Sequence, residues 1–133
     1  MKIALDTAAV ADSLYADSAL GVLVRSAPGG YAARVLTPEN ADALGRIVAD
    51  AFAVAAVRLG WEMPGELSVE APDDVPRYAV QSALVAATAM IARSIIYAVC
   101  GDGRSQQSLS MAWDVLDGLA EPRAAPISLT PYL

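Results

Sequence analysis

The segment from Pro76 to Val99 constrains the fold of this chain more than any other part of its sequence. Its spacing predicts one long helix with apolar side chains on almost every side: Val80, Leu84, Val85, Met90, Ile91, Ile95, Ile96 and Val99. A helix with so little polar surface is buried on several sides. In a chain of 133 residues, neighbouring elements cannot easily cover all of it. We therefore expect a second protein surface to contact Leu84, Ile91 and Ile95.

The composition favours closely packed helices with thin cores. Hydrophobic residues make up 56% of the chain but aromatic residues only 6%, because 28 residues are alanine. Alanine is the best helix former, but its small side chain fills little core volume. The net charge is −6, and the eight arginines and one lysine occur singly. No basic stripe is available, so we expect no sequence-specific nucleic-acid binding.

A second long helix is predicted over about residues 38–59. Thr37 is a good N-cap, Pro38 occupies the first helical position and Gly60 follows the last apolar residue. Apolar residues repeat at i, i+3, i+4 and i+7 along one face, which consists of Leu44, Ile47, Val48, Ala51, Ala55 and Leu59. This face is expected to pack on the core.

Shorter elements complete the predicted fold. We expect KIAL as a short edge strand or lead-in, helices at about 8–15 and 17–26, extended chain at 31–36, an arm with one short strand at about 61–75, a polar loop CGDGRSQQS, and a last helix from Ser105 or Ser108 to Ala120. Asp73 or Asp74 would cap the long helix that follows the arm. The chain is thus predicted to be a mainly α, small helical bundle, with one domain at 1–121 and an extended tail at 122–133.

The sequence offers few candidates for catalysis. Histidine is absent, which removes the commonest general base, the triads built on histidine and most zinc sites. Cys100 follows an apolar helix, where a small core residue is the simplest interpretation. Asp114, Asp117 and Glu121 favour a solvated helix face or partners for an arginine. We therefore predict neither an enzyme nor a cofactor.

A cluster of carboxylates leaves one alternative open. Glu62, Glu66, Glu70, Asp73 and Asp74 lie close in the sequence and could bind a divalent ion. Their spacing matches no calcium-binding loop, and Asp73 and Asp74 already serve as helix caps in this interpretation. We therefore predict no metal site.

The sequence also predicts no membrane anchor. Asp6 and Asp12 lie where a secretory signal would be apolar. The longest uncharged stretch, 78–92, is too short to span a bilayer and is followed by Arg93. A single cysteine excludes an internal disulfide framework and suits a reducing compartment.

The chain ends in EPRAAPISLTPYL, which combines three prolines with several apolar residues. The prolines exclude a helix, and a purely solvated tail would be more polar. Proline also restricts the chain to extended geometry and so reduces the entropy lost on binding. We expect this tail to bind a surface of the same chain or of another. The residues expected to make that contact are Pro126, Ile127, Leu129, Pro131, Tyr132 and Leu133.

The order of these elements resembles that of small structural proteins of tailed phages and prophages, in the region that joins head and tail. The matching elements are the short N-terminal helices, the LTPEN helix, the strand-like ELSVEAPDD, the long apolar helix, the final helix and the EPRAAPISLTPYL tail. They cover most of the chain as a pattern of elements.

This resemblance implies a non-enzymatic head–tail connector (adaptor) subunit. Such subunits form a homo-oligomeric ring, commonly of twelve copies, beneath the portal, and DNA passes through its centre. Their extended termini contact the portal, the tail or a neighbouring ring. The resemblance implies a place in the virion, at the head–tail junction, after a stay in the host cytoplasm. The acidic balance agrees with this role, because a negative lining lets DNA slide without sticking.

Other functions stay open on the sequence. The chain could be a phage tail-completion protein, or a cytoplasmic helical module that regulates or binds a host protein through the same surfaces. An enzyme that uses carboxylates and a metal ion is a further alternative.

Overall fold

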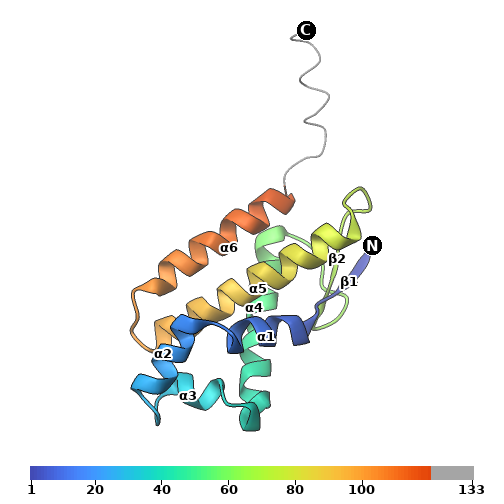
Figure 1. Cartoon of the computed structure of the whole chain (residues 1–133). Coiled ribbons are helices and arrows are strands. Elements are labelled where there is room, and N and C mark those ends of the chain that lie inside the picture. Colours follow the sequence, from blue (N-terminus) through green and yellow to red (C-terminus); the bar gives the residue numbers. More distant parts are fainter. Residues whose placement is uncertain (121–133) are drawn as a thin grey trace, which may run out of the picture.

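The computed structural model describes residues 1–120, which form a mainly helical domain with one small sheet (Figure 1). In chain order the elements are β1 (Lys2–Ala4), α1 (Thr7–Tyr15), α2 (Ser18–Ser26), α3 (Tyr31–Val35), the 3-10 helix η1 (Pro38–Asn40), α4 (Ala41–Leu59), β2 (Ser68–Glu70), α5 (Arg77–Val99) and α6 (Arg104–Ala120). The predicted mainly α class and both long helices are confirmed. The predicted start of the second helix is wrong, because residues 38–40 form η1, Thr37 makes no side-chain cap and α4 begins at Ala41. The predicted tail at 122–133 lies outside the described residues.

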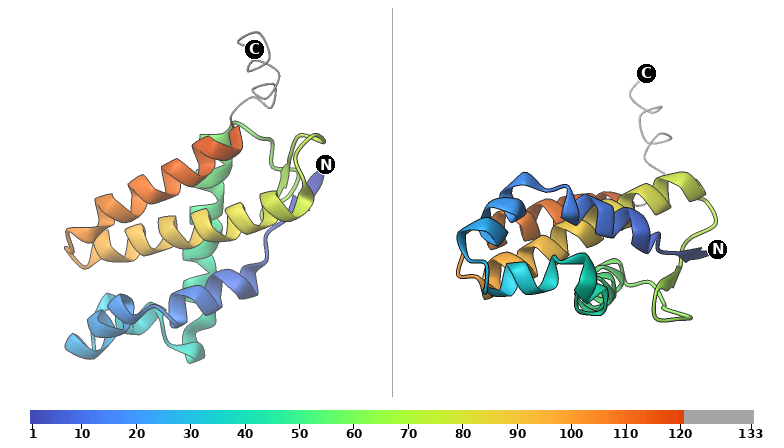
Figure 2. Two further views of the ribbon diagram at one scale, coloured as in Figure 1. Left: turned by 45° about the horizontal axis from the view of Figure 1, so that its top comes forward. Right: turned by 60° about the horizontal axis from the view of Figure 1, so that its bottom comes forward.

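Helix α5 lies at the centre of the domain. Helix α6 runs beside it, and α1 and α4 pack against it from other sides (Figures 1 and 2). Val80, Leu84 and Ile96 are completely buried, and Ile91 is only 2% exposed. A partner surface therefore cannot reach Leu84 or Ile91 in this structure. This burial corrects the expectation of a contact at these two residues, because α1, α4 and α6 together cover most of the apolar surface of α5.

Two buried serines join α5 to α6 along their contact. The hydroxyl of Ser94 donates to the carbonyl oxygen of Ser105 at 2.8 Å, and that of Ser108 donates to the carbonyl oxygen of Met90 at 2.7 Å. Small side chains allow such close approach of two helix backbones. The contact thus combines apolar packing with satisfied hydroxyl groups, which a dry core requires.

The turn between α5 and α6 is shorter than the sequence predicted. Gly101 adopts a φ of +70°, a left-handed conformation that favours glycine. A carboxylate oxygen of Asp102 accepts a hydrogen bond from the backbone N–H of Arg104 at 2.9 Å. Because this bond caps the helix early, α6 begins at Arg104 and includes residues that were expected in the loop.

Aspartates cap the first two helices. Asp6 accepts from the N–H of Ala9 at 3.1 Å, and Asp17 accepts from the N–H of Leu20 at 2.9 Å. The prediction of extended chain at 31–36 is wrong, since Tyr31–Val35 is the short helix α3. Ala32 and Val35 lie three residues apart, and the helix buries both on one face.

The arm at about 61–75 folds back onto the N-terminus. Strand β2 pairs antiparallel with β1, and Ile3 lies opposite Val69 in the register. Both of these side chains are completely buried. The predicted short strand and the predicted edge strand are therefore confirmed as one two-stranded sheet. The predicted cap is wrong: α5 starts after Pro76 with no side-chain cap.

Helix α5 is long and apolar enough to cross a membrane by length and composition alone. Its most apolar window has a mean hydropathy of 1.7, and half of that window is buried within the protein. The bent pair α1 and α2, with 61° between the two helices, passes the same criterion when taken together. Core helices of compact domains also meet this criterion, and the burial of α5 accounts for its hydropathy.

Candidate functional site

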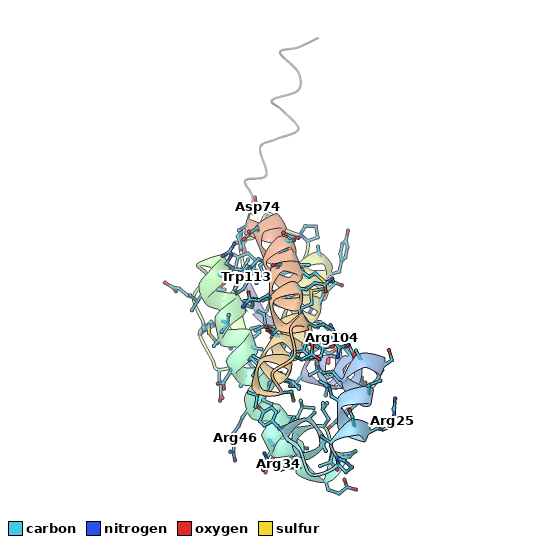
Figure 3. All side chains as sticks on the ribbon, turned by 90° about the vertical axis from the view of Figure 1, so that its left-hand side faces the viewer. Arg25, Arg34, Arg46, Asp74, Arg104 and Trp113 are labelled. Carbon is cyan, nitrogen blue, oxygen red and sulfur yellow. The ribbon has the colours of Figure 1, made fainter. Side chains whose placement is uncertain are left out.

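An open apolar groove between α4 and α6 is the strongest candidate for a binding site in the described part of the chain. Its volume is about 400 Å³, and it is lined by Ala53, Val54, Val57, Arg58 and Trp113. We call it the α4–α6 groove. Val57 is 81% exposed, which is unusual for a valine on a helix of the core. Trp113 lies where α6 faces α4 (Figure 3).

The one charged side chain of this groove is held in place by its neighbours. The Arg58 guanidinium donates to both carboxylate oxygens of Asp117, at 3.0 and 2.9 Å. It also lies over the ring of Trp113, 4.7 Å from the centroid. The bonds from Arg58 lower the pKa of Asp117, and Asp117 in turn raises the pKa of Arg58. The prediction that an acidic residue on the last helix pairs with an arginine is thus confirmed for Asp117.

The chemistry of the α4–α6 groove is that of a docking surface. Its walls are methyl groups, an indole ring and the face of an arginine whose charge is already balanced. None of these side chains can act as a nucleophile or a general base at neutral pH. Such a groove binds apolar side chains by removing their surface from water.

A second hollow, of about 260 Å³, lies at the junction of α2, α5 and α6 and has two arginines in its wall. Arg93 contacts Asp17 at 2.6 Å and donates to the hydroxyl of Ser13 at 3.0 Å. Arg104 forms two bonds with Asp102, at 3.0 and 2.7 Å, and lies 4.8 Å from the centroid of the Tyr97 ring. Both guanidinium groups are therefore engaged by carboxylates.

The charged groups around this second hollow stabilise the fold. The hydrogen bonds from Arg104 lower the pKa of Asp102 to about 2, and they keep this carboxylate charged. Burial raises the pKa of Tyr97. Arg93 joins the α1–α2 corner to α5, whereas the Asp102–Arg104 pair stabilises the turn between α5 and α6.

The carboxylates considered for a metal ion have a different role. The N-terminal ammonium group of Met1 contacts Glu70 at 2.6 Å and Asp73 at 3.0 Å. Both contacts raise the pKa of that ammonium group, with the hydrogen bond to Glu70 as the largest cause. No group of three or more carboxylate, histidine or cysteine side chains within residues 1–120 could hold a metal ion. Asp73 thus contacts the N-terminus, and it does not cap α5, because that helix begins at Arg77 with Pro76 at the N-cap position.

The structure brings together few of the residues predicted for an interface. Leu84 and Ile91 are core residues, whereas Ile95 is half-buried and packs against the core. The six tail residues named above, from Pro126 to Leu133, lie outside the described residues. The prediction that Cys100 is a core residue is wrong, because it is exposed at the end of α5.

The residues of the α4–α6 groove were missed by the sequence analysis. Val54, three residues after Ala51, lies at the edge of the apolar face of α4, and Val57 falls on the side that a periodic pattern assigns to solvent. A valine outside the apolar stripe, Val57, is the signal that could have located the groove. Trp113, by contrast, is half-buried on α6.

The comparisons with known proteins give no further identification: no protein-family model, no curated protein and no solved structure matches this chain.

Proposed function

We propose that this protein is a non-enzymatic structural subunit that assembles head to tail into a ring, of the kind that connects head and tail in tailed phages. The observation that carries the proposal is the opposite charge of the two ends of the domain. Between the ends, three arginines pair with carboxylates, and the exposed charges of Asp42, Arg46 and Asp50 are of both signs. Contacts between unlike ends of successive copies close into a ring when the rotation between copies allows it.

One end of the domain is acidic. Residues 61–76 hold five carboxylates and no lysine or arginine. Glu70 and Asp73 are occupied by the N-terminal ammonium group, but Glu62, Glu66 and Asp74 are exposed and take part in no ion pair within residues 1–120. We call these three residues the acidic end; Asp74 marks it in Figure 3.

The other end carries two arginines. Residues 18–36 contain Arg25 and Arg34 and no aspartate or glutamate. Both arginines are exposed, and neither forms an ion pair with any described residue. We call them the arginine end. Arg25 and Arg34 lie far from Asp74, on the opposite side of the domain (Figure 3).

A head-to-tail contact between these ends agrees with the connector role in a second way. It would balance the charge of the ends in the contact, while most of the net charge of −6 stays on the remaining surface. A ring with a negative inner face lets DNA pass without adhering to it. The subunit would act in the virion after assembly from the host cytoplasm, with the portal and the tail as its neighbours.

The test is the native mass of the chain at low and high salt, followed by electron microscopy of any large species. We expect a closed oligomer at low salt that dissociates as salt increases, because the Debye length falls to about 3 Å at 1 M. The double variant R25E/R34E should remain monomeric, and so should E62R/E66R.

A matched control is the chain that carries all four reversals. It restores opposite charges at the two ends, so it should form the oligomer again. A monomer under every condition, or an open filament in place of a ring, would contradict the connector proposal. An oligomer that none of these variants affects would contradict the charge contact.

The α4–α6 groove favours a second candidate function, a helical module that binds one protein partner. A monomer or dimer that captures an apolar peptide in this groove would support that function. A tail-completion protein would share the head-to-tail contact, and the number of copies in the assembly separates it from a connector.

A further inference from the structure

We propose that the α4–α6 groove binds the C-terminal tail of the same molecule, with Ile127 and Leu129 against Val57 and Trp113. The occupant is the segment 121–133, which continues from the end of α6 beyond the described residues. The proposal stands whether or not the protein assembles into a ring, because it concerns a contact within one molecule.

The reach of the chain supports this occupant. Trp113 precedes Ala120, the last residue of α6, by seven positions, which is about 10 Å along a helix axis. A reversal of the chain needs about four residues. Three further extended residues then cover about 10 Å in the opposite direction. Ile127, seven positions after Ala120, therefore reaches the level of Trp113.

The side chains of the tail complement those of the groove. Ile127 and Leu129 are two residues apart, so an extended chain presents both to the same side. Residues 124–133 contain no charged side chain. This neutrality suits a groove whose arginine already binds Asp117 through two hydrogen bonds. A charged peptide would gain little there.

The prolines of the tail fit a groove made of helix side chains. The walls named for this groove offer no open strand edge, so a bound peptide cannot satisfy its N–H groups by strand pairing. Each buried N–H without a partner is costly. Pro122, Pro126 and Pro131 lack that N–H group, and they also limit the entropy lost on docking.

The short connection favours the molecule's own tail over the tail of a second copy. A short flexible tether gives an effective concentration in the millimolar range. A contact of two apolar side chains is too small to bind tightly from solution, but it is favoured when the tail is attached next to the groove. Dilution should then have no effect on occupancy.

Trp113 provides a probe for this contact. The chain has two tryptophans, Trp61 and Trp113, so the variant W61F reports on the groove alone. We would measure quenching of its fluorescence by acrylamide in the full chain. Truncation after Glu121, or the pair I127S/L129S, should raise the quenching constant about twofold or more, as expected when a tethered ligand occupies its site for at least half of the time.

Matched variants separate docking from other effects. The pair S128A/T130A alters the neighbouring tail residues and should leave the quenching constant unchanged. V57S alters the groove and should raise the quenching constant. V99S alters a valine that is also exposed (57%) but lies outside the groove, and it should leave the quenching constant unchanged. Circular dichroism of each variant checks that the helices are intact.

The outcomes distinguish this inference from the proposed ring. Protection of Trp113 that is the same over a roughly hundredfold range of protein concentration supports docking within one molecule. Protection that grows with concentration assigns the groove to the tail of another copy and overturns the inference. Equal quenching in the full chain and the truncated chain also overturns it. Measurements at high salt, where a charge-linked ring dissociates, keep the two proposals separate.

Discussion

Helix α5 and the outer side of α4 are both apolar, but residues 1–120 cover the first and leave the second open. The side chains of Val80, Leu84 and Ile96 on α5 are completely buried by the chain itself, whereas Val57 on α4 is 81% exposed. The difference teaches that the total hydrophobicity of a helix does not locate a binding surface. A central helix is apolar because several neighbours cover it. An apolar residue outside the core-facing stripe of a peripheral helix indicates a binding surface better than the total hydrophobicity of a helix does.

The largest effect should come from a truncation within the covered helix. Leu84→Ala removes a completely buried side chain, and we expect a loss of about 3 kcal/mol in the free energy of unfolding, since a cavity adds to the lost transfer energy. The matched variant Val57→Ala should change that free energy by no more than about 0.5 kcal/mol. Urea unfolding of both variants measures the contrast. If both variants lose the same free energy of unfolding, the contrast between the buried and the exposed position is contradicted.

A smaller effect of opposite sign is expected at Thr88, the polar exception within the covered helix. Its hydroxyl is buried and has no hydrogen-bond partner among residues 1–120. Thr88→Val keeps the shape and removes the unsatisfied group, so it should raise the free energy of unfolding by about 1 kcal/mol. Thr88→Ser is the control, because it keeps the hydroxyl and loses the methyl group, and it should destabilise. A loss of stability in Thr88→Val would show that the hydroxyl has a partner.

The turn that brings α6 onto α5 should respond to acid. The pKa of Asp102 is lowered from 3.8 to about 2 by its hydrogen bonds with Arg104. A carboxylate with a lowered pKa stabilises the folded state above its ordinary pKa, and this contribution is lost as the pH falls through the lowered value. The difference in stability between the wild type and Asp102→Asn should therefore shrink between about pH 4 and pH 2. Thermal unfolding across this range tests the direction, and a constant difference would contradict it.

The smallest effect should occur at Cys100, which lies at the exposed end of the covered helix. A thiol reagent should label it in the folded protein at a rate that denaturant does not limit. Cys100→Ser should change the free energy of unfolding by no more than about 0.5 kcal/mol, as is usual for surface positions. If the thiol reacts only after unfolding, Cys100 is buried and the prediction is wrong.

Local features of the sequence determined most of the secondary structure. The aspartates that cap α1 and α2 and the glycine that follows α4 are signals that act within one turn of the chain. The period of the apolar residues identified the core face of α4. Helix ends and helix faces depend on residues that are near in the sequence, so the sequence alone was sufficient to predict them.

The tertiary structure decided what each surface contacts. Only the arrangement of α1, α4 and α6 around α5 shows that Leu84 is inside, and only the contact between α4 and α6 turns Val57 and Trp113 into one groove. The contact of the N-terminal ammonium group with Asp73 likewise joins groups that lie far apart in the sequence. Burial is a property of surfaces that meet in space, and no periodic pattern within one helix can specify which surface comes to cover it.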